Sequence, residues 1–106
     1  MEFVETGTFT RRIYELLSDD DYGELQHTLI RHPEAGKLIR GGRGLRKIRW
    51  RSTRSSRGKR GGVRVIYYCY SDDLIYMLYS YGKSDQKDLT HGQLNSLCKY
   101  VEKGLL

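Results

Sequence analysis

The sequence lacks the features that would place it in a membrane, in an oxidising compartment or around a metal. No run of eighteen apolar residues occurs, so we expect no transmembrane helix. Residues 1–9 lack the basic and apolar regions of a signal peptide, which predicts a cytoplasmic protein. Cys69 and Cys98 lie far apart, without a CxxC pair or histidines at metal-ligand spacing. We therefore expect two reduced thiols, no metal and no cofactor.

Acidic residues are missing from the middle of the chain. No Asp or Glu lies between Glu34 and Asp72, whereas this interval holds twelve Lys and Arg residues. The 106 residues carry a formal net charge of +6, which suits a nucleic acid or an anionic membrane surface. The length predicts one domain, residues 1–106, with one modest core.

The first third of the chain predicts a strand followed by two helices. Phe3 alternates with polar neighbours in a short strand over residues 1–5. A helical face that Thr8 could cap is formed by Phe9, Ile13, Leu16 and Leu17. The polar run 18–20 ends this helix and offers a cap to a second one. The pair His32-Pro33 ends the second helix, because the residue before proline avoids the helical region.

Residues 34–43 predict a loop, and strand patterns follow over residues 45–51, 63–70 and 74–81. The polar turn 71–73 joins the last two strands into a hairpin. A basic loop rich in Ser and Gly, residues 51–62, joins the first two strands.

The C-terminal segment predicts a final helix. Thr90 and Gln93 match a capping box, Leu89 and Leu94 match a hydrophobic staple, and Gly104 is placed to end the helix. The predicted order is β-α-α-β-β-β-α. This is an α+β fold, with a small, mostly antiparallel sheet and helices packed on one face.

Period-two alternation predicts what the other face of the sheet displays. Lys47 and Arg49 point to one side of their strand, and Ile48 and Trp50 point to the side that helices should cover. The basic pair therefore faces the open side, where Arg64 and Lys83 could join it. Such a surface would fit a phosphodiester backbone.

Three segments resemble the sheet motifs of the RelE/ParE superfamily of bacterial toxins. They are Gly44-Leu45-Arg46-Lys47-Ile48-Arg49, Arg64-Val65-Ile66-Tyr67-Tyr68, and Gly82-Lys83 followed by Gln86-Lys87. HigB-like toxins are the most similar group, including the GKRGG segment 58–62. The resemblance implies a RelE-like microbial RNase fold and a toxin of a type II toxin-antitoxin system. It also implies cleavage of messenger RNA on the ribosome, and neutralisation by a cognate antitoxin of the HigA type with a helix-turn-helix domain.

RNA cleavage by the 2′-OH needs a base, an acid and stabilisation of negative charge. We expect His27, His32 and His91 to be surface residues, because they lie on helices or at helix ends, away from the basic strands. RelE-type toxins use Lys, Arg and Tyr, and crowding by cations could favour the neutral amine of a lysine base. The resemblance thus implies catalytic roles for Lys47, Arg64 and Lys83. For the late catalytic tyrosine of the family, Tyr81 is the nearest substitute, or Lys87 could donate the proton.

The sequence departs from the family pattern at three positions. The position of Lys47 is often Glu in the wider superfamily, Ser84 replaces an arginine, and Thr90 stands where a late catalytic tyrosine would fall. The residues expected to bind RNA are Arg46, Arg49, Arg54, Arg57, Lys59, Arg60 and Lys87. A ParE-like toxin that inhibits DNA gyrase and a non-catalytic RNA-binding module remain the alternatives.

Overall fold

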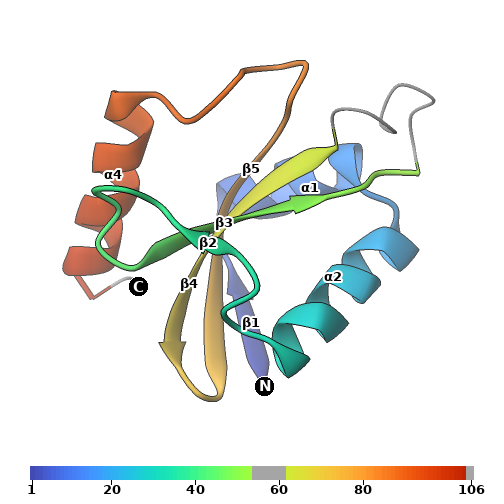
Figure 1. Cartoon of the computed structure of the whole chain (residues 1–106), viewed down its shortest axis with the longest axis horizontal. Coiled ribbons are helices and arrows are strands. Elements are labelled where there is room, and N and C mark those ends of the chain that lie inside the picture. Colours follow the sequence, from blue (N-terminus) through green and yellow to red (C-terminus); the bar gives the residue numbers. More distant parts are fainter. Residues whose placement is uncertain (54–61, 105–106) are drawn as a thin grey trace.

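The computed structural model describes residues 1–53 and 62–104. Its elements are β1 (Glu2–Glu5), α1 (Gly7–Leu16), α2 (Asp19–Arg31), β2 (Lys37–Leu38), β3 (Leu45–Trp50), β4 (Val63–Ser71), β5 (Leu74–Gly82) and α4 (His91–Glu102). The strands form one five-stranded sheet in the order β1-β5-β4-β3-β2 (Figure 1). β1 pairs with β5 in parallel, and the other described pairs are antiparallel. The predicted α+β class with a mostly antiparallel sheet is confirmed.

Polar caps set the ends of the first two helices. Thr6 caps α1, since its Oγ1 accepts a hydrogen bond from the backbone N of Phe9 at 3.1 Å. The prediction that Thr8 caps this helix was therefore wrong, because Thr8 already lies within its first turn. Ser18 caps α2 as predicted, and Arg31 is the last residue of α2. The end of α2 is thus set by the proline that follows, as the sequence indicated.

The last helix begins and ends as predicted. Thr90 and Gln93 form a capping box in which each side chain bonds the other residue's backbone N–H. Beyond the helix, Gly104 has a φ of +81°, a left-handed conformation that favours glycine.

Strand β2 lies inside the segment predicted to be a loop. Lys37 pairs with Lys47, and Leu38 pairs with Arg46. Both β2 residues are exposed, so their side chains carry no alternation that a sequence pattern could reveal. The chain returns to β3 through Gly44, whose φ of +101° requires glycine.

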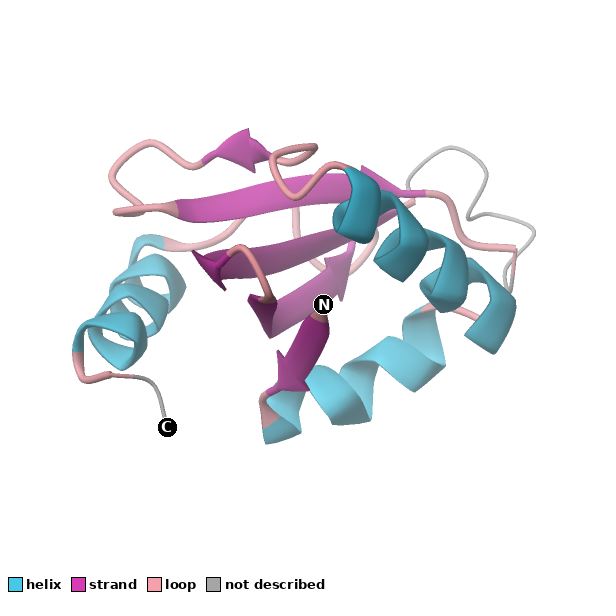
Figure 2. Cartoon of the chain, turned by 90° about the horizontal axis from the view of Figure 1, so that it is seen from below, coloured by secondary structure: helices cyan, strands magenta, loops and turns pink. Residues whose placement is uncertain are grey.

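Helices cover both faces of the sheet, so the prediction of helices on one face was wrong. One core, under α1 and α2, contains Phe9, Ile13, Leu17, Leu25, Leu29, Ile48, Val65, Tyr67, Ile75 and Met77. The other core, under α4, contains Leu45, Ile66, Leu78, Tyr81 and Cys98, with Leu94, Leu97 and Val101 packed against it. Figure 2 shows α4 on one side of the strands and both N-terminal helices on the other.

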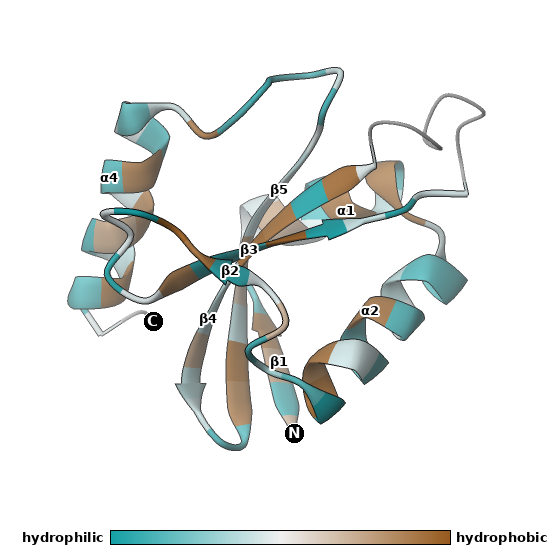
Figure 3. Ribbon diagram, viewed as in Figure 1, coloured by the Kyte–Doolittle hydropathy of each residue, from teal (hydrophilic) through white to brown (hydrophobic). Residues whose placement is uncertain are grey.

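The composition of the central strands explains the two cores. Val63 to Tyr67 are all buried, so β4 presents large side chains to both faces. Figure 3 shows apolar residues along the central strands and on the helix sides that face them. A helix layer on one face alone would leave Ile66 and Leu78 in water.

Both cysteines are free thiols in the described structure. Cys98 is buried in the core under α4, whereas Cys69 is half-buried, and its Sγ lies 3.4 Å from the carbonyl O of Pro33. None of the described helices has the length and apolar character needed to cross a membrane.

Candidate functional site

Side chains from three neighbouring strands form a row across the sheet face that α4 partly covers. Arg49 on β3 lies opposite Arg64 on β4, and Arg64 lies opposite Tyr81 on β5. Lys47 lies on the same face of β3, two residues before Arg49. Facing side chains on adjacent strands are close enough to interact. We call Lys47, Arg49, Arg64 and Tyr81 the cross-strand cluster.

The predicted alternation along β3 is confirmed. Ile48 and Trp50 pack in the core under α1 and α2, so Lys47 and Arg49 face the α4 side. This face is less open than predicted, because the core under α4 occupies one part of it. Within the cluster Arg49 is exposed, whereas Arg64 is 8% exposed and Tyr81 only 1% exposed.

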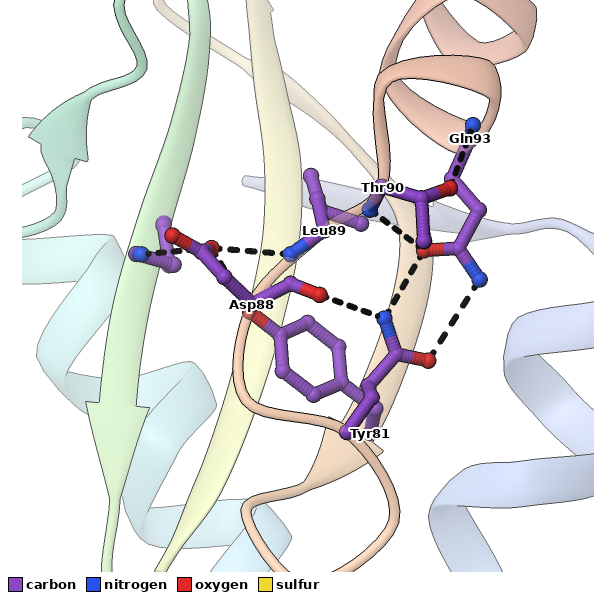
Figure 4. A network of polar contacts seen from close by, with 7 residues as sticks. Tyr81, Asp88, Leu89, Thr90 and Gln93 are labelled. Atoms are coloured by element: carbon purple, nitrogen blue, oxygen red, sulfur yellow. Dashed lines mark hydrogen bonds and ion pairs between the residues drawn. The ribbon is translucent and has the colours of Figure 1, made fainter.

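Asp88, in the connection between β5 and α4, joins two members of the cluster (Figure 4). Its Oδ1 accepts hydrogen bonds from Lys47 Nζ at 3.2 Å, from the Tyr81 hydroxyl at 3.4 Å and from the backbone N of Leu89 at 2.8 Å. The contact with Lys47 is also an ion pair. One carboxylate oxygen thus links β3, β5 and the start of α4.

The same contacts shift two pKa values in opposite directions. The hydrogen bond from the Leu89 N–H, followed by the one from Lys47, lowers the pKa of Asp88 below its ordinary value. Burial, followed by the Asp88 carboxylate, raises the pKa of Tyr81 to about 12, although the charge of Arg64 opposes this. Asp88 is therefore a carboxylate at neutral pH, and Tyr81 is a neutral hydrogen-bond donor.

These contacts bear on the expected roles of Lys47 and Tyr81. The sequence suggested a lysine surrounded by cations, but Lys47 pairs with an acidic group, the Asp88 carboxylate. The Tyr81 hydroxyl is turned to Asp88 on a side chain that is 1% exposed. In this conformation Tyr81 holds Asp88 and does not present its hydroxyl to a substrate.

A groove of about 430 Å³ lies between β2, β3 and the beginning of α4. It is lined by Lys37, Leu38, Ile39, Arg40, Lys47, Asp88, Leu89, Thr90, His91 and Leu94. The expectation that His91 lies away from the basic strands was wrong, because His91 shares this groove with Lys47. Strand β3 and the beginning of α4 lie beside each other because the long connection between β5 and α4 folds back.

Two glutamines hold that connection against the sheet. Gln86 Nε2 donates to Gln93 Oε1 at 2.8 Å and to the backbone O of Asp88 at 2.8 Å. Gln93 Nε2 donates to the Tyr79 hydroxyl at 3.1 Å. These bonds fix the start of α4 relative to β5, and thereby the place of Asp88 beside Lys47 (Figure 4).

Other predicted site residues are scattered. Lys83 and Lys87 are exposed in the connection after β5, near the cluster in sequence. Arg46 lies on the opposite face of β3, where its NH1 donates to the carbonyl O of Gly36 at 2.7 Å and its NH2 pairs with Glu34 at 3.5 Å. Arg46 is therefore not part of the basic face. It directly precedes Lys47, and adjacent residues of a strand point to opposite faces of the sheet.

The four basic-loop residues Arg54, Arg57, Lys59 and Arg60 lie outside the described residues. The segment just before them is anchored: Asp21 Oδ2 accepts bonds from the backbone N and from the Oγ1 of Thr53, each at 2.8 Å. Ser52 Oγ also donates to the carbonyl O of Leu16 at 2.6 Å. Ser52 and Thr53 are therefore held against the end of α1 and the start of α2.

The sequence analysis missed Asp88, His91, Lys37 and Arg40 as site residues. Asp88 stands just before a clear helix cap, and an acidic residue there is commonly explained by capping alone. Lys37 and Arg40 lie in a segment without any period. Asp88 and His91 stand on either side of the capping residue Thr90 in the sequence. This position does not reveal that both lie beside Lys47 once the connection has folded.

No protein-family model matches the chain. Within the described residues, no group of three or more His, Cys, Asp or Glu side chains could hold a metal ion.

Proposed function

We propose that this protein is an endoribonuclease that cleaves messenger RNA on the ribosome, as a HigB-like toxin of the RelE/ParE superfamily. The observation that carries the proposal is the cross-strand cluster, in which Arg49, Arg64 and Lys47 share one sheet face. Guanidinium groups on adjacent strands suit the oxygens of one phosphodiester. The groove beside them leaves room for the strand to continue.

The reaction is an attack by the 2′-OH oxygen on the neighbouring phosphorus. The P–O2′ bond forms and the P–O5′ bond breaks, which yields a 2′,3′-cyclic phosphate and a 5′-hydroxyl. Arg49 and Arg64 stabilise the charge that develops on the phosphoryl oxygens. Lys83, exposed beyond the end of β5, binds an adjacent phosphate.

Proton transfer falls to the two groups that share the groove. His91 accepts the proton of the 2′-OH, since histidine is the side chain type best suited to proton transfer near neutral pH. Lys47, as an ammonium group held by Asp88, protonates the leaving 5′-oxygen. Tyr81 positions Asp88, which is a different role from the catalytic one that the resemblance implied.

The proposed partners follow from this substrate. Ribosomes and messenger RNA place the protein in the cytoplasm. The net charge of +6 favours an antitoxin whose toxin-binding segment is acidic, because charge complementarity speeds association. The resemblance to HigB-like toxins adds a helix-turn-helix domain on that antitoxin.

The test is a reconstituted translation reaction followed by primer extension on the message. We expect the wild-type protein to cut the message only when ribosomes translate it. Arg49→Ala should cut at least about 100-fold more slowly, the loss typical when one charge-stabilising group is removed. Arg31→Ala, an exposed arginine at the far end of α2, is the matched control and should cut at the wild-type rate. A wild-type protein that leaves the message intact would disprove the proposal.

One observation favours a second candidate, a ParE-like inhibitor of DNA gyrase. Two of the four predicted catalytic side chains, Lys47 and Tyr81, are engaged by Asp88. A gyrase inhibitor needs no catalytic base, so the contacts of Asp88 with Lys47 and Tyr81 would not impair its inhibitory activity. Inhibition of DNA supercoiling without RNA cleavage is the result that would select this candidate.

A further inference from the structure

We infer that the groove between β2, β3 and α4 binds the nucleotide next to the cleaved bond, and that it disfavours uridine there. The inference rests on the proposed function, because it concerns the substrate of that site. It adds a base preference to the reaction and assigns it to residues outside the cross-strand cluster.

The position of the groove provides the first argument. Lys47 belongs both to the cluster and to the groove wall, and His91 lines the same groove. An RNA strand whose phosphate lies over Arg49 and Arg64 therefore has a neighbouring nucleotide over the groove.

The lining provides the second argument. Leu38, Ile39, Leu89 and Leu94 form apolar walls, and Lys37 and Arg40 add cationic groups. A nucleotide has the matching parts: a flat base that is driven out of water and a phosphate that is attracted by cations. A volume of about 430 Å³ lies within the range of small-molecule sites.

The base preference comes from a hydrogen-bond acceptor in the groove, the carboxylate of Asp88. Among the described residues that line the groove, Asp88 is the one acidic residue, and its lowered pKa keeps it a carboxylate. A carboxylate accepts hydrogen bonds from the exocyclic amino groups of bases. Adenine, cytosine and guanine carry such a group. Uracil offers only its ring N3–H, which lies between two carbonyl oxygens that a carboxylate repels, so uridine makes the weakest complex.

The cationic groups of the groove would also attract an acidic peptide. The nucleotide is favoured because Lys47, which protonates the leaving oxygen in the proposed reaction, also lines the groove and pairs there with Asp88. The peptide is retained as an outcome of the experiment.

The experiment maps cut positions on a mixed messenger pool in the translation reaction described above. Leu38→Trp fills the groove from an edge strand, where Leu38 is 62% exposed and outside both cores. Tyr70→Trp, at a residue 60% exposed on the far hairpin, is the matched control. We expect wild type and Tyr70→Trp to disfavour uridine at least about five-fold at one fixed position beside the cut, as a lost base contact predicts. Leu38→Trp should lose that discrimination.

Arg40→Gln removes a cation and leaves the apolar walls and Asp88 in place. It should raise the protein concentration needed for cutting and keep the base preference, whereas Lys99→Gln, on α4 outside the groove lining, should change neither. A base profile that is unchanged in Leu38→Trp overturns the inference while leaving the proposed function intact.

The remaining outcomes are also decisive. If Leu38→Trp cuts nowhere although it is folded, Leu38→Ala decides, because it enlarges the groove: a changed profile supports the inference and an unchanged one overturns it. If wild type cuts no message, the proposed function fails and the inference fails with it. If a synthetic acidic peptide binds wild type but not Leu38→Trp while the base profiles agree, the groove is a protein-binding site and the inference is overturned.

Discussion

The two faces of the sheet differ in how completely their helices bury them. Under α1 and α2, Phe9, Leu25 and Leu29 are 0% exposed and meet a continuous apolar strand surface. Under α4, Leu45 and Ile66 are equally buried, but the same strands carry Lys47, Arg49 and Arg64 a few residues away. The face under α1 and α2 is therefore an apolar core, whereas the face on the α4 side consists of a smaller core and a charged surface.

Two buried tyrosines show the same difference at the level of hydrogen bonds. Tyr67, on the face under α1 and α2, donates to the carbonyl O of Pro33 at 2.7 Å and accepts from the backbone N of Gly36 at 2.8 Å. Tyr81, on the α4 face, has one long bond of 3.4 Å to an exposed carboxylate. Tyr67 thus links β4 to residues 33–36 by hydrogen bonds, whereas Tyr81 orients the Asp88 carboxylate at the candidate site.

The largest effect should come from truncating the fully buried face. Phe9→Ala should lower the free energy of unfolding by about 3–5 kcal/mol, because it removes a whole ring from a close-packed core. Leu97→Ala, at a partly buried residue of α4, should cost about 1–2 kcal/mol. Urea unfolding followed by circular dichroism measures both values. Equal losses would contradict the difference between the two faces.

A second change separates stability from activity on the α4 face. Arg64→Ala should slow message cleavage at least about 100-fold and abolish growth arrest, while the protein still folds. Arg64→Lys should restore little, because an ammonium group cannot bond two phosphate oxygens in the way a guanidinium can. Folding is checked by circular dichroism and cleavage by primer extension. Cleavage by Arg64→Ala at close to the wild-type rate would remove Arg64 from the site.

The tyrosine pair gives a sharper comparison, since each change removes one oxygen atom. Tyr67→Phe should cost about 1–3 kcal/mol, because it leaves the Gly36 N–H and the Pro33 carbonyl without this partner inside the protein. Tyr81→Phe should cost less than about 1 kcal/mol, because its bond is long and Asp88 reaches water. Thermal unfolding of the two variants at one pH measures the difference. A larger loss for Tyr81→Phe would reverse the assignment of the faces.

The last pair of changes should have small effects, one of which depends on pH. Burial acts to raise the pKa of Asp21, but hydrogen bonds from Thr53 and Ser18 outweigh it and lower the pKa. A lowered folded pKa stabilises the fold fully above the unfolded value, near 4, and this contribution is lost as pH falls through the folded pKa. Asp21→Asn should therefore cost about 1 kcal/mol at pH 7, and this loss should shrink as pH falls below about 4.

The control for this titration is Asp88→Asn. Its carboxylate is 67% exposed at the side chain, so solvent screening should leave a stability change within a few tenths of a kcal/mol. Urea unfolding between pH 2 and pH 7 measures both variants. A loss in Asp21→Asn that did not shrink at all as pH fell would contradict a stabilising role for the charge of Asp21.

The sequence predicted most of the fold because period and capping are local properties. The alternation of Lys47 and Ile48 told which side chain faces the core, and Ser18, Thr90 and Gln93 marked helix starts. The prediction of helices on one face of the sheet was wrong because an alternating pattern reveals one buried face, whereas the central strands are buried on both faces. A run such as Val63 to Tyr67 is a signal for two covering layers.

The site was only partly predictable, because its geometry depends on the connection between β5 and α4. Arg49 and Arg64 were placed together correctly, since strand pairing follows from the hairpin and alternation. Asp88 and His91 could not be placed, because residues 83–89 have no period and their path depends on side chains such as Gln86 and Gln93. Register can be inferred from a pattern, whereas the path of an irregular segment depends on contacts that exist only after folding.

The parallel pairing of β1 with β5 has a consequence for the order of events during synthesis. Glu2 pairs with Leu74 and Glu5 with Met77, so the first strand made must wait for one of the last before its edge is closed. The core under α4 is completed later still, with residues 91–102. A nascent chain therefore lacks both the finished sheet and the carboxylate of Asp88 for most of its translation. If the proposed function holds, the cluster and Asp88 could act on a message only after residues 91–102 have been made and folded.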